Sequence, residues 1–162
     1  MGEVKTLYDE DFVAWSREQA NALRSAARGG SNQKLDWENL AEEIESLGLS
    51  ERRELGSQIR RIIEHLLKLE FSEAIDPRRG WIGSIDDART EIEVLLETSP
   101  SLRHELSGIV ASETRRALRK VMRELQSYGE LSPATAARVQ TRTYNPEQIV
   151  GDWFPPEPDR GE

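Results

Sequence analysis

"LDWENLAEEIESLGLSERRELGSQIRRIIEHLLKLEF" occupies residues 35–71, and its apolar residues recur every three or four positions, which is typical of amphipathic helices. Asp36 precedes the pattern as an N-cap residue would. We expect a helix that ends at Gly48, because glycine commonly stops helices, and a second helix that is capped by Ser50 and runs to about Phe71. The predicted apolar stripes are Trp37, Leu40, Ala41, Ile44 and Leu47, then Leu55, Ile59, Ile62, Ile63, Leu66 and Leu67.

Caps and breakers divide the rest of the chain into further helices. The stretch DPRRGWIG, residues 76–83, is rich in turn residues, so we expect a connection there and a helix capped by Ser84 after it. The other predicted helices cover about 8–28, ending at Gly29 and Gly30, then Pro100 to about Tyr128 after a Ser99 cap, and two short segments near 133–140 and 146–151 that each begin with a cap and a proline.

The fold class that follows is all-α, because no strand-like alternation occurs in the sequence. A length of 162 residues suits a single domain. We expect an antiparallel bundle of four to five main helices over about 7–130. Residues 131–162 would add short helices and an extended tail that packs on the bundle through Trp153 and Phe154.

Composition excludes several kinds of chemistry. The chain has no cysteine, so disulfides, thiolate nucleophiles and zinc–cysteine sites are impossible. The net charge of −8 disfavours general binding to nucleic acids, since that affinity depends on neutralising phosphates. No apolar run is long enough to span a membrane, and we expect a cytoplasmic protein without a membrane partner.

Several stretches occur in an order that resembles a known family. They are LYDEDFVAWSREQANAL, LDWENLAEEIESLG, HLLK, SPSL and NPEQIVGDWFP. The chain resembles the bacterial family catalogued as domain of unknown function twenty-nine, over most of its length. The resemblance implies a compact helical domain and supplies no activity and no catalytic residues.

The acids of residues 38–45 have two interpretations. Glu38, Glu42 and Glu45 share one helix face, opposite the predicted apolar stripe, which favours a solvated structural face. Alternatively, Glu42 and Glu45 bind one divalent cation, and His65 supplies a nitrogen ligand if the two helical segments fold back on each other. Manganese, iron or zinc would suit such a set, and the protein would be a metal-dependent hydrolase or a nuclease-like enzyme.

Other catalytic patterns are missing. His65 and His104 are the only histidines, and the sequence has no Glu-x-x-His, no His-Glu-x-x-His and no Gly-x-Ser-x-Gly. We expect His104 to be exposed and His65 to border the apolar stripe. The sequence therefore leans away from an enzyme, and it predicts no cofactor apart from the alternative transition-metal ion.

A basic face occurs in the segment ETRRALRKVMRE, residues 113–124. The cations on it are Arg115, Arg116, Arg119, Lys120 and Arg123. Pairing with acids of the same chain is the favoured interpretation, ahead of an acidic protein partner and of a nucleic-acid accessory role. The leading functional hypothesis is a non-enzymatic interaction or accessory module that binds a protein partner or itself through a helix face.

Overall fold

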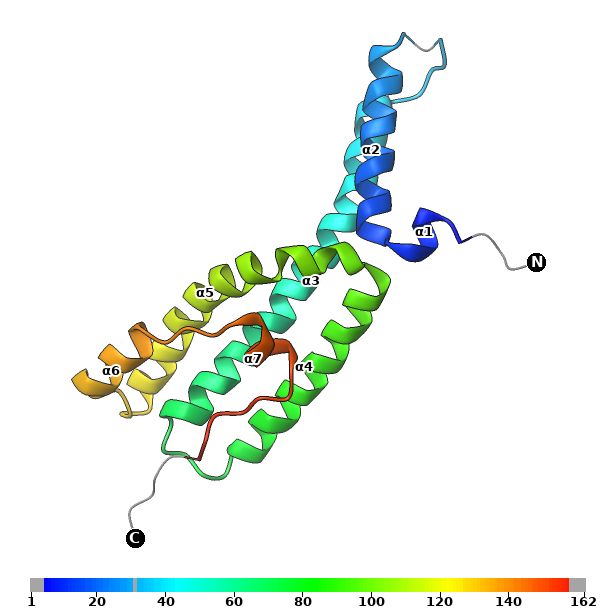
Figure 1. Cartoon of the computed structure of the whole chain (residues 1–162). Coiled ribbons are helices and arrows are strands. Elements are labelled where there is room, and N and C mark those ends of the chain that lie inside the picture. Colours follow the sequence, from blue (N-terminus) through cyan, green and yellow to red (C-terminus); the bar gives the residue numbers. More distant parts are fainter. Residues whose placement is uncertain (1–4, 31, 158–162) are drawn as a thin grey trace. The chain divides into compact units, whose positions relative to one another are not determined.

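The computed structural model describes residues 5–30 and 32–157, and all regular structure in these residues is helical, which confirms the all-α class (Figure 1). None of the described helices is long and apolar enough to cross a membrane. The helices, in chain order, are α1 (Leu7–Glu10), α2 (Phe12–Arg28), α3 (Trp37–Phe71), α4 (Arg78–Thr98), the 3₁₀-helix η1 (Pro100–Glu105), α5 (Leu106–Ser127), α6 (Pro133–Gln140) and α7 (Pro146–Val150).

The described chain forms two compact units. Unit 1 contains the described residues of 1–55 together with 94–104. Unit 2 contains 56–93 and the described residues of 105–162. The helices α3 and α4 each contribute residues to both units.

Helix α3 is one helix from Trp37 to Phe71, so the predicted end at Gly48 and the predicted cap at Ser50 are wrong. Gly48 has another role. A Cβ atom at this position would lie 2.2 Å from Ser16 Oγ of α2, so the glycine permits a close approach of the two helices in unit 1. Asp36 caps α3 as predicted, because its carboxylate accepts the backbone N–H of Asn39 at 3.4 Å.

Helix α4 begins earlier than the sequence suggested. It starts at Arg78, so Gly80 and Gly83 are helical and the connection predicted over 76–83 is mostly wrong. The N–H of Trp81 donates to the carbonyl of Pro77 at 3.0 Å, which closes the first turn. Proline is well tolerated at a helix start, and this start outweighs the low helix propensity of two glycines.

Ser99 also differs from its expected role as a cap. Its hydroxyl accepts the N–H of Val13 and donates to Glu51, both at 3.3 Å. The segment after it is the 3₁₀-helix η1, and α5 begins only at Leu106. The Ser99 side chain is thus buried and connects three segments of unit 1, rather than capping a long helix.

Unit 2 has a continuous apolar core, to which α3, α4, α5 and the C-terminal segment contribute. The fully buried side chains of α3 include Ile59, Ile62, Ile63, Leu66 and Leu67. Helices α3 and α5 run in the same direction, since residues 60, 64 and 68 of α3 pair with 113, 120 and 124 of α5. The expected antiparallel arrangement therefore fails for this pair.

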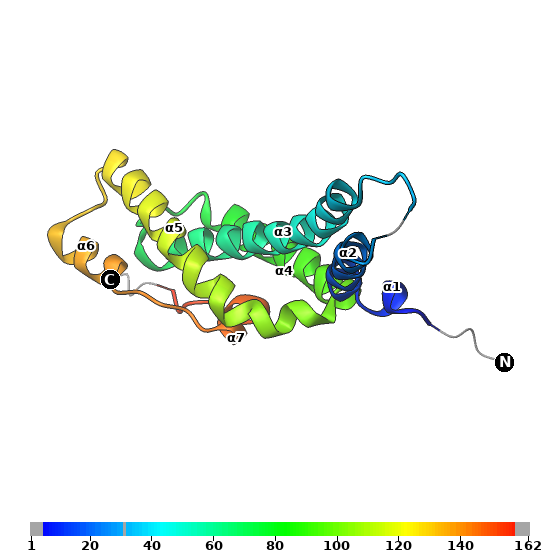
Figure 2. The same cartoon turned by 90° about the horizontal axis from the view of Figure 1, so that it is seen from above.

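The short C-terminal helices form as predicted. Ser132 caps α6 and Asn145 caps α7, and a proline follows each cap. The tail packs in unit 2, where the Arg89 guanidinium donates to the carbonyl of Trp153 at 2.6 Å and lies 4.8 Å from the ring centre of Phe154. Figure 2 shows this C-terminal segment returning along the helices of unit 2.

Candidate functional site

Unit 1 is built on an antiparallel hairpin of α2 and the first part of α3 (Figure 1). Small residues line the contact between the two helices. Ser16, Ala20, Ala41 and Gly48 are all buried, and Val13 and Leu55 are larger buried side chains of this unit. We call this narrow line of small residues the seam of the hairpin. It brings the two backbones close together and leaves the outer parts of both helices uncovered.

One side of the hairpin is held by ion pairs. Arg24 of α2 lies 2.8 Å from Glu45 and 3.4 Å from Glu38 of α3. The hydrogen bond from Arg24 lowers the pKa of Glu45, and the bond to Glu45 raises the pKa of Arg24. Two members of the predicted acidic stripe are therefore paired within unit 1, whereas Glu42 is exposed.

The opposite side of the hairpin is apolar. Leu40 and Leu47 were expected in the buried stripe of α3, but 41% and 48% of their surfaces are exposed, and Ile44 between them is half-buried. Successive residues turn by about 100° around a helix, so these three side chains share one edge of α3. Ala41 and Gly48 mark the buried line of α3. The edge with the three apolar side chains lies on one side of this line, and Glu38 and Glu45 lie on the other side.

Helix α2 contributes to the same side. Arg24 of α2 contacts Glu38 and Glu45 of α3 on one side of the contact between the two helices. The edges of α2 and α3 away from these ion pairs must therefore face the same side of the hairpin. On α2 that edge carries Trp15, Gln19 and Leu23, all of which are half-buried. We call these α2 residues together with Leu40, Ile44 and Leu47 of α3 the apolar face of the hairpin.

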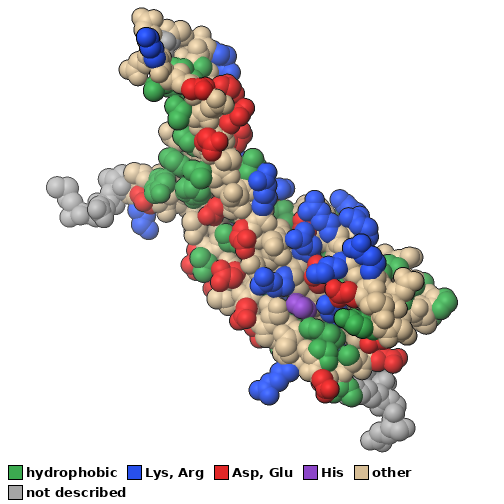
Figure 3. Space-filling view, turned by 180° about the vertical axis from the view of Figure 1, so that it is seen from behind, with side chains coloured by type: hydrophobic (Ala, Val, Ile, Leu, Met, Phe, Trp, Pro, Cys, Tyr) green, Lys and Arg blue, Asp and Glu red, His purple; other side chains and the backbone are tan. Residues whose placement is uncertain are grey.

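An aromatic cluster extends the apolar face toward α1. The ring centres of Tyr8 and Trp15 lie 4.9 Å apart in an edge-to-face arrangement, and Phe12 stacks on Trp15 at 5.7 Å. Tyr8 remains 53% exposed. Figure 3 shows hydrophobic side chains gathered on unit 1, with acidic side chains close by.

The proposed metal ligands do not come together. Glu42 and Glu45 share a face, but His65 lies 20 positions beyond Glu45 on the same continuous helix. A rise of about 1.5 Å per residue separates them by roughly 30 Å along the helix. The fold-back that this set required depended on a break at Gly48, and α3 has none. No group of three or more histidine or acidic residues in the described chain is arranged to hold a metal ion.

His65 lies in unit 2 and borders the core, as predicted. Its Nδ1 atom is buried without a hydrogen-bond partner among the described residues. Burial lowers the pKa of His65, and the charge of Lys68 lowers it further. Both effects favour the neutral form of the imidazole. His104 is exposed, as expected.

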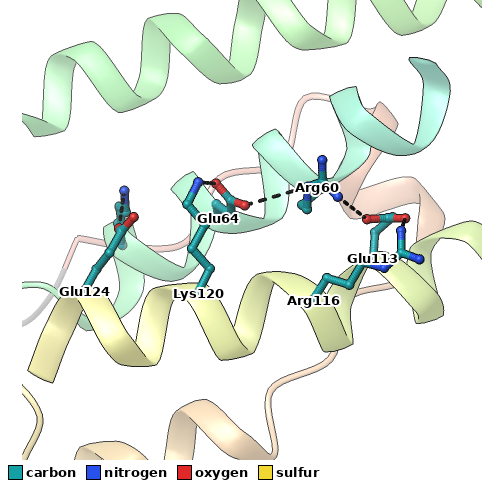
Figure 4. A network of polar contacts seen from close by, with 7 residues as sticks. Arg60, Glu64, Glu113, Arg116, Lys120 and Glu124 are labelled. Carbon is teal, nitrogen blue, oxygen red and sulfur yellow. Dashed lines mark hydrogen bonds and ion pairs between the residues drawn. The ribbon is translucent and has the colours of Figure 1, made fainter. Parts of the chain in front are cut away.

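The basic face of α5 is used partly within unit 2. Lys120 lies 2.6 Å from Glu64 of α3, and Arg116 lies 2.7 Å from Glu113 of its own helix. Arg60 of α3 adds contacts of 3.9 Å to Glu64 and 3.4 Å to Glu113 (Figure 4). Each of these two nearly buried carboxylates is thus shared by two cations, which confirms the predicted pairing within the chain for Arg116 and Lys120.

Three cations of the basic face point elsewhere. Arg115, Arg119 and Arg123 are exposed, and their side chains make no ion pair or hydrogen bond with another described residue. Figure 3 shows basic side chains gathered on one face of unit 2. The sequence interpretation did not find the acids Glu64 and Glu113. A signal was available for Glu113, which lies at apolar spacing between Val110 and Ala117.

A second polar cluster in unit 2 anchors the C-terminal segment. Glu70 of α3 accepts hydrogen bonds from Arg142 Nε at 2.7 Å, from Arg142 Nη2 at 2.6 Å and from the Tyr144 hydroxyl at 3.0 Å. The bond to Glu70 raises the pKa of Arg142, and burial raises that of Tyr144. A hollow of about 750 Å³ lies beside this cluster, next to Phe71 and Arg138.

Two other hollows of unit 2 are smaller. One of about 320 Å³ lies between Trp81 and Tyr128, beside the ion pair of Lys68 with Glu124. One of about 470 Å³ lies against Leu118 of α5. None of the three hollows is lined by a histidine. None of them therefore places a hydroxyl nucleophile beside a histidine base.

Comparison with known proteins gives a family and a fold. The family model described as "Domain of unknown function DUF29" matches residues 7–154. A crystal structure of an α-helical protein of unknown function from Rhodospirillum rubrum is similar to this chain, with 25% identity and a TM-score of 0.65, over 94% of this chain and 100% of that one. No curated protein matches the chain.

Proposed function

This chain belongs to the family of domain of unknown function DUF29, and we propose that it acts in the cytoplasm as a non-enzymatic protein-interaction module. The observation that carries the proposal is the apolar face of the α2–α3 hairpin. Leu40 and Leu47 are long aliphatic side chains on a well-formed helix, and both are more than two-fifths exposed.

The distribution of apolar surface supports this assignment. Nine large hydrophobic residues are exposed in the described part of the chain, and six of them belong to unit 1: Tyr8, Leu35, Leu40, Leu47, Leu49 and Val94. Scattered exposed leucines are ordinary on protein surfaces, but a contiguous apolar patch marks an interaction site more often. On the hairpin, Leu40, Ile44 and Leu47 are contiguous because they are spaced by four and three residues on one helix edge.

Protein contact at this face is tested by site-specific photocrosslinking in the native cell. A photoreactive phenylalanine analogue is placed at position 40 or 47 on the apolar face, and at position 42 as a matched control. Glu42 is exposed on the same helix but lies away from the face. We expect protein adducts from positions 40 and 47 and few from position 42. Equal yields at all three positions would overturn the proposal.

A further inference from the structure

We infer that the occupant of the apolar face is an amphipathic helix of another protein, with Lys and Arg flanking its apolar stripe. The inference rests on the proposed function and adds the chemistry of the partner. It follows from the charges at the border of the apolar face.

The apolar face is bordered by acids on both of its outer edges. On α3, Glu43 lies between Leu40 and Leu47, three residues after the first and four before the second. On α2, Glu18 lies three residues after Trp15, on the outer edge of that helix. Both carboxylates are exposed, and neither has an ion pair with another described residue.

These acids are not offset by Arg24, Arg28 or Arg53 of the hairpin. Arg24 is committed to Glu38 and Glu45 on the other side of the hairpin. Arg28 and Arg53 lie about 80° around their helices from Glu18 and Glu43, in the direction away from the apolar face. A docked helix would therefore meet an apolar centre and two negative edges, and basic flanks on that helix would complement them.

The same border disfavours two other occupants. A second copy of this chain, seated face to face by two-fold symmetry, would bring the acidic edges of both copies together, and like charges across an interface are costly. A lipid surface that carries anionic headgroups attracts apolar faces bordered by Lys and Arg, which is the reverse of this pattern.

The size of the face suits a single helix. Leu40 and Leu47 lie seven residues apart, or about 10 Å along α3. The edge of α2 runs beside it in the opposite direction. Two antiparallel helices that leave one common side open present a seat for a third helix, whose anchors would recur at three- and four-residue intervals.

Three synthetic helical peptides of about 18 residues test the inference. The first has a leucine stripe flanked by Lys and Arg, and the second has the same stripe flanked by Glu. The third keeps the composition of the first but disperses its leucines, so that it retains charge without an apolar stripe. Binding of labelled peptides to the full chain is measured by fluorescence anisotropy.

We expect the basic amphipathic peptide to bind at least tenfold more tightly than either of the others. Leu47→Gln should weaken this binding at least tenfold, and the double variant Glu18→Lys/Glu43→Lys should reverse the order of the basic and acidic peptides. Val94→Gln is the matched control, because Val94 is an equally exposed apolar residue of unit 1 on another helix. This substitution should leave binding unchanged.

Several results would overturn the inference. The acidic peptide could bind as tightly as the basic peptide or more tightly, or the basic peptide could fail to bind at millimolar concentration. The chain could form a dimer that Leu47→Gln dissociates. The chain could also bind anionic vesicles, with binding abolished by the same substitution. If photocrosslinks form at positions 40 and 47 but the basic peptide fails, the partner chemistry is wrong and the interaction role stands. If no position-specific crosslinks form in the cell, the proposed function itself fails.

Discussion

The two halves of α3 carry similar hydrophobic patterns and have different surroundings. In unit 2, Ile59, Ile62, Ile63, Leu66 and Leu67 are fully buried between neighbouring helices. In unit 1, the same helix buries Ala41 and Gly48 and leaves more than two-fifths of the surfaces of Leu40 and Leu47 exposed. Periodicity thus identifies the helix in both halves, but the number of helices packed around it decides which apolar residues enter a core.

The comparison also separates two kinds of helix contact. Unit 2 is held by large interlocking side chains and by carboxylates that are each shared by two cations. Unit 1 is held by the close approach of small residues, by Ser99 and by the Arg24 ion pairs. Unit 2 contains its own core, whereas the hairpin of unit 1 leaves Leu40 and Leu47 partly exposed on one side.

The largest expected effect comes from truncating the core of unit 2. Ile62→Ala should lower the free energy of unfolding by about 2–5 kcal/mol, because it removes a fully buried side chain and leaves a cavity. Leu47→Ala on the apolar face should change it by less than about 0.5 kcal/mol. Urea denaturation measures both. A loss at Leu47 as large as that at Ile62 would show that the face is covered within the chain and would remove the contrast between the units.

The anchor of the C-terminal segment should have the next largest effect. Glu70→Gln removes the charge that Arg142 and Tyr144 share, and it should lower the free energy of unfolding by about 1–3 kcal/mol. Limited proteolysis should cut the segment after residue 141 faster in this variant. Glu93→Gln is a suitable control, because Glu93 is exposed in the same unit. Equal proteolysis in both variants would mean that the aromatic contacts of Trp153 and Phe154 suffice to hold the segment.

A smaller effect should mark the close contact in unit 1. Gly48→Ala gains helix propensity of about 1 kcal/mol but forces the Ser16 hydroxyl away from its hydrogen bond to Val13. We expect the variant to be no more stable than the parent chain. The double variant Gly48→Ala/Ser16→Ala should recover stability, since the new Cβ would lie 3.4 Å from the Cβ of residue 16.

The control for this contact is Gly83→Ala. Gly83 lies within α4, and no atom outside its own helical turn lies within 4 Å of a Cβ built there. This substitution should stabilise the chain by about 0.5–1 kcal/mol. If Gly48→Ala stabilises to the same extent, the seam of the hairpin is not tightly packed.

The sequence predicts most helices and caps of this fold, and the reasons for its failures are physical. Asp36, Ser132 and Asn145 act through contacts within three residues, so local patterns suffice to find them. The pattern predicts a helix end at Gly48, because the sequence does not show whether a glycine ends a helix or permits a close neighbour. That distinction depends on Ser16, which lies 32 positions from Gly48 in the sequence.

The candidate site was harder to predict than the fold. The acidic stripe directs attention to Glu42 and Glu45, but the surface that we propose as an interaction site includes Leu40 and Leu47, which the pattern assigns to the core. A core leucine differs from an exposed leucine of this kind only in whether another helix covers it, and no helix of unit 1 among the described residues buries Leu40 or Leu47. Such an absence is a tertiary property, and no local signal in one sequence records it.

The smallest expected effect concerns pH and His65 in unit 2. Burial and Lys68 lower its pKa in the folded chain, so the unfolded chain binds a proton more readily as the pH falls below the ordinary value of 6.5. In His65→Gln, unfolding no longer depends on protonation of this imidazole. The free energy of unfolding of the parent chain, relative to that of the variant, should therefore fall as the pH decreases from about 7 to 5. Urea denaturation at several pH values measures the difference, and carboxylates common to both proteins cancel. A relative stability that rises on acidification would mean that Glu64 outweighs burial and that the imidazole gains a proton on folding.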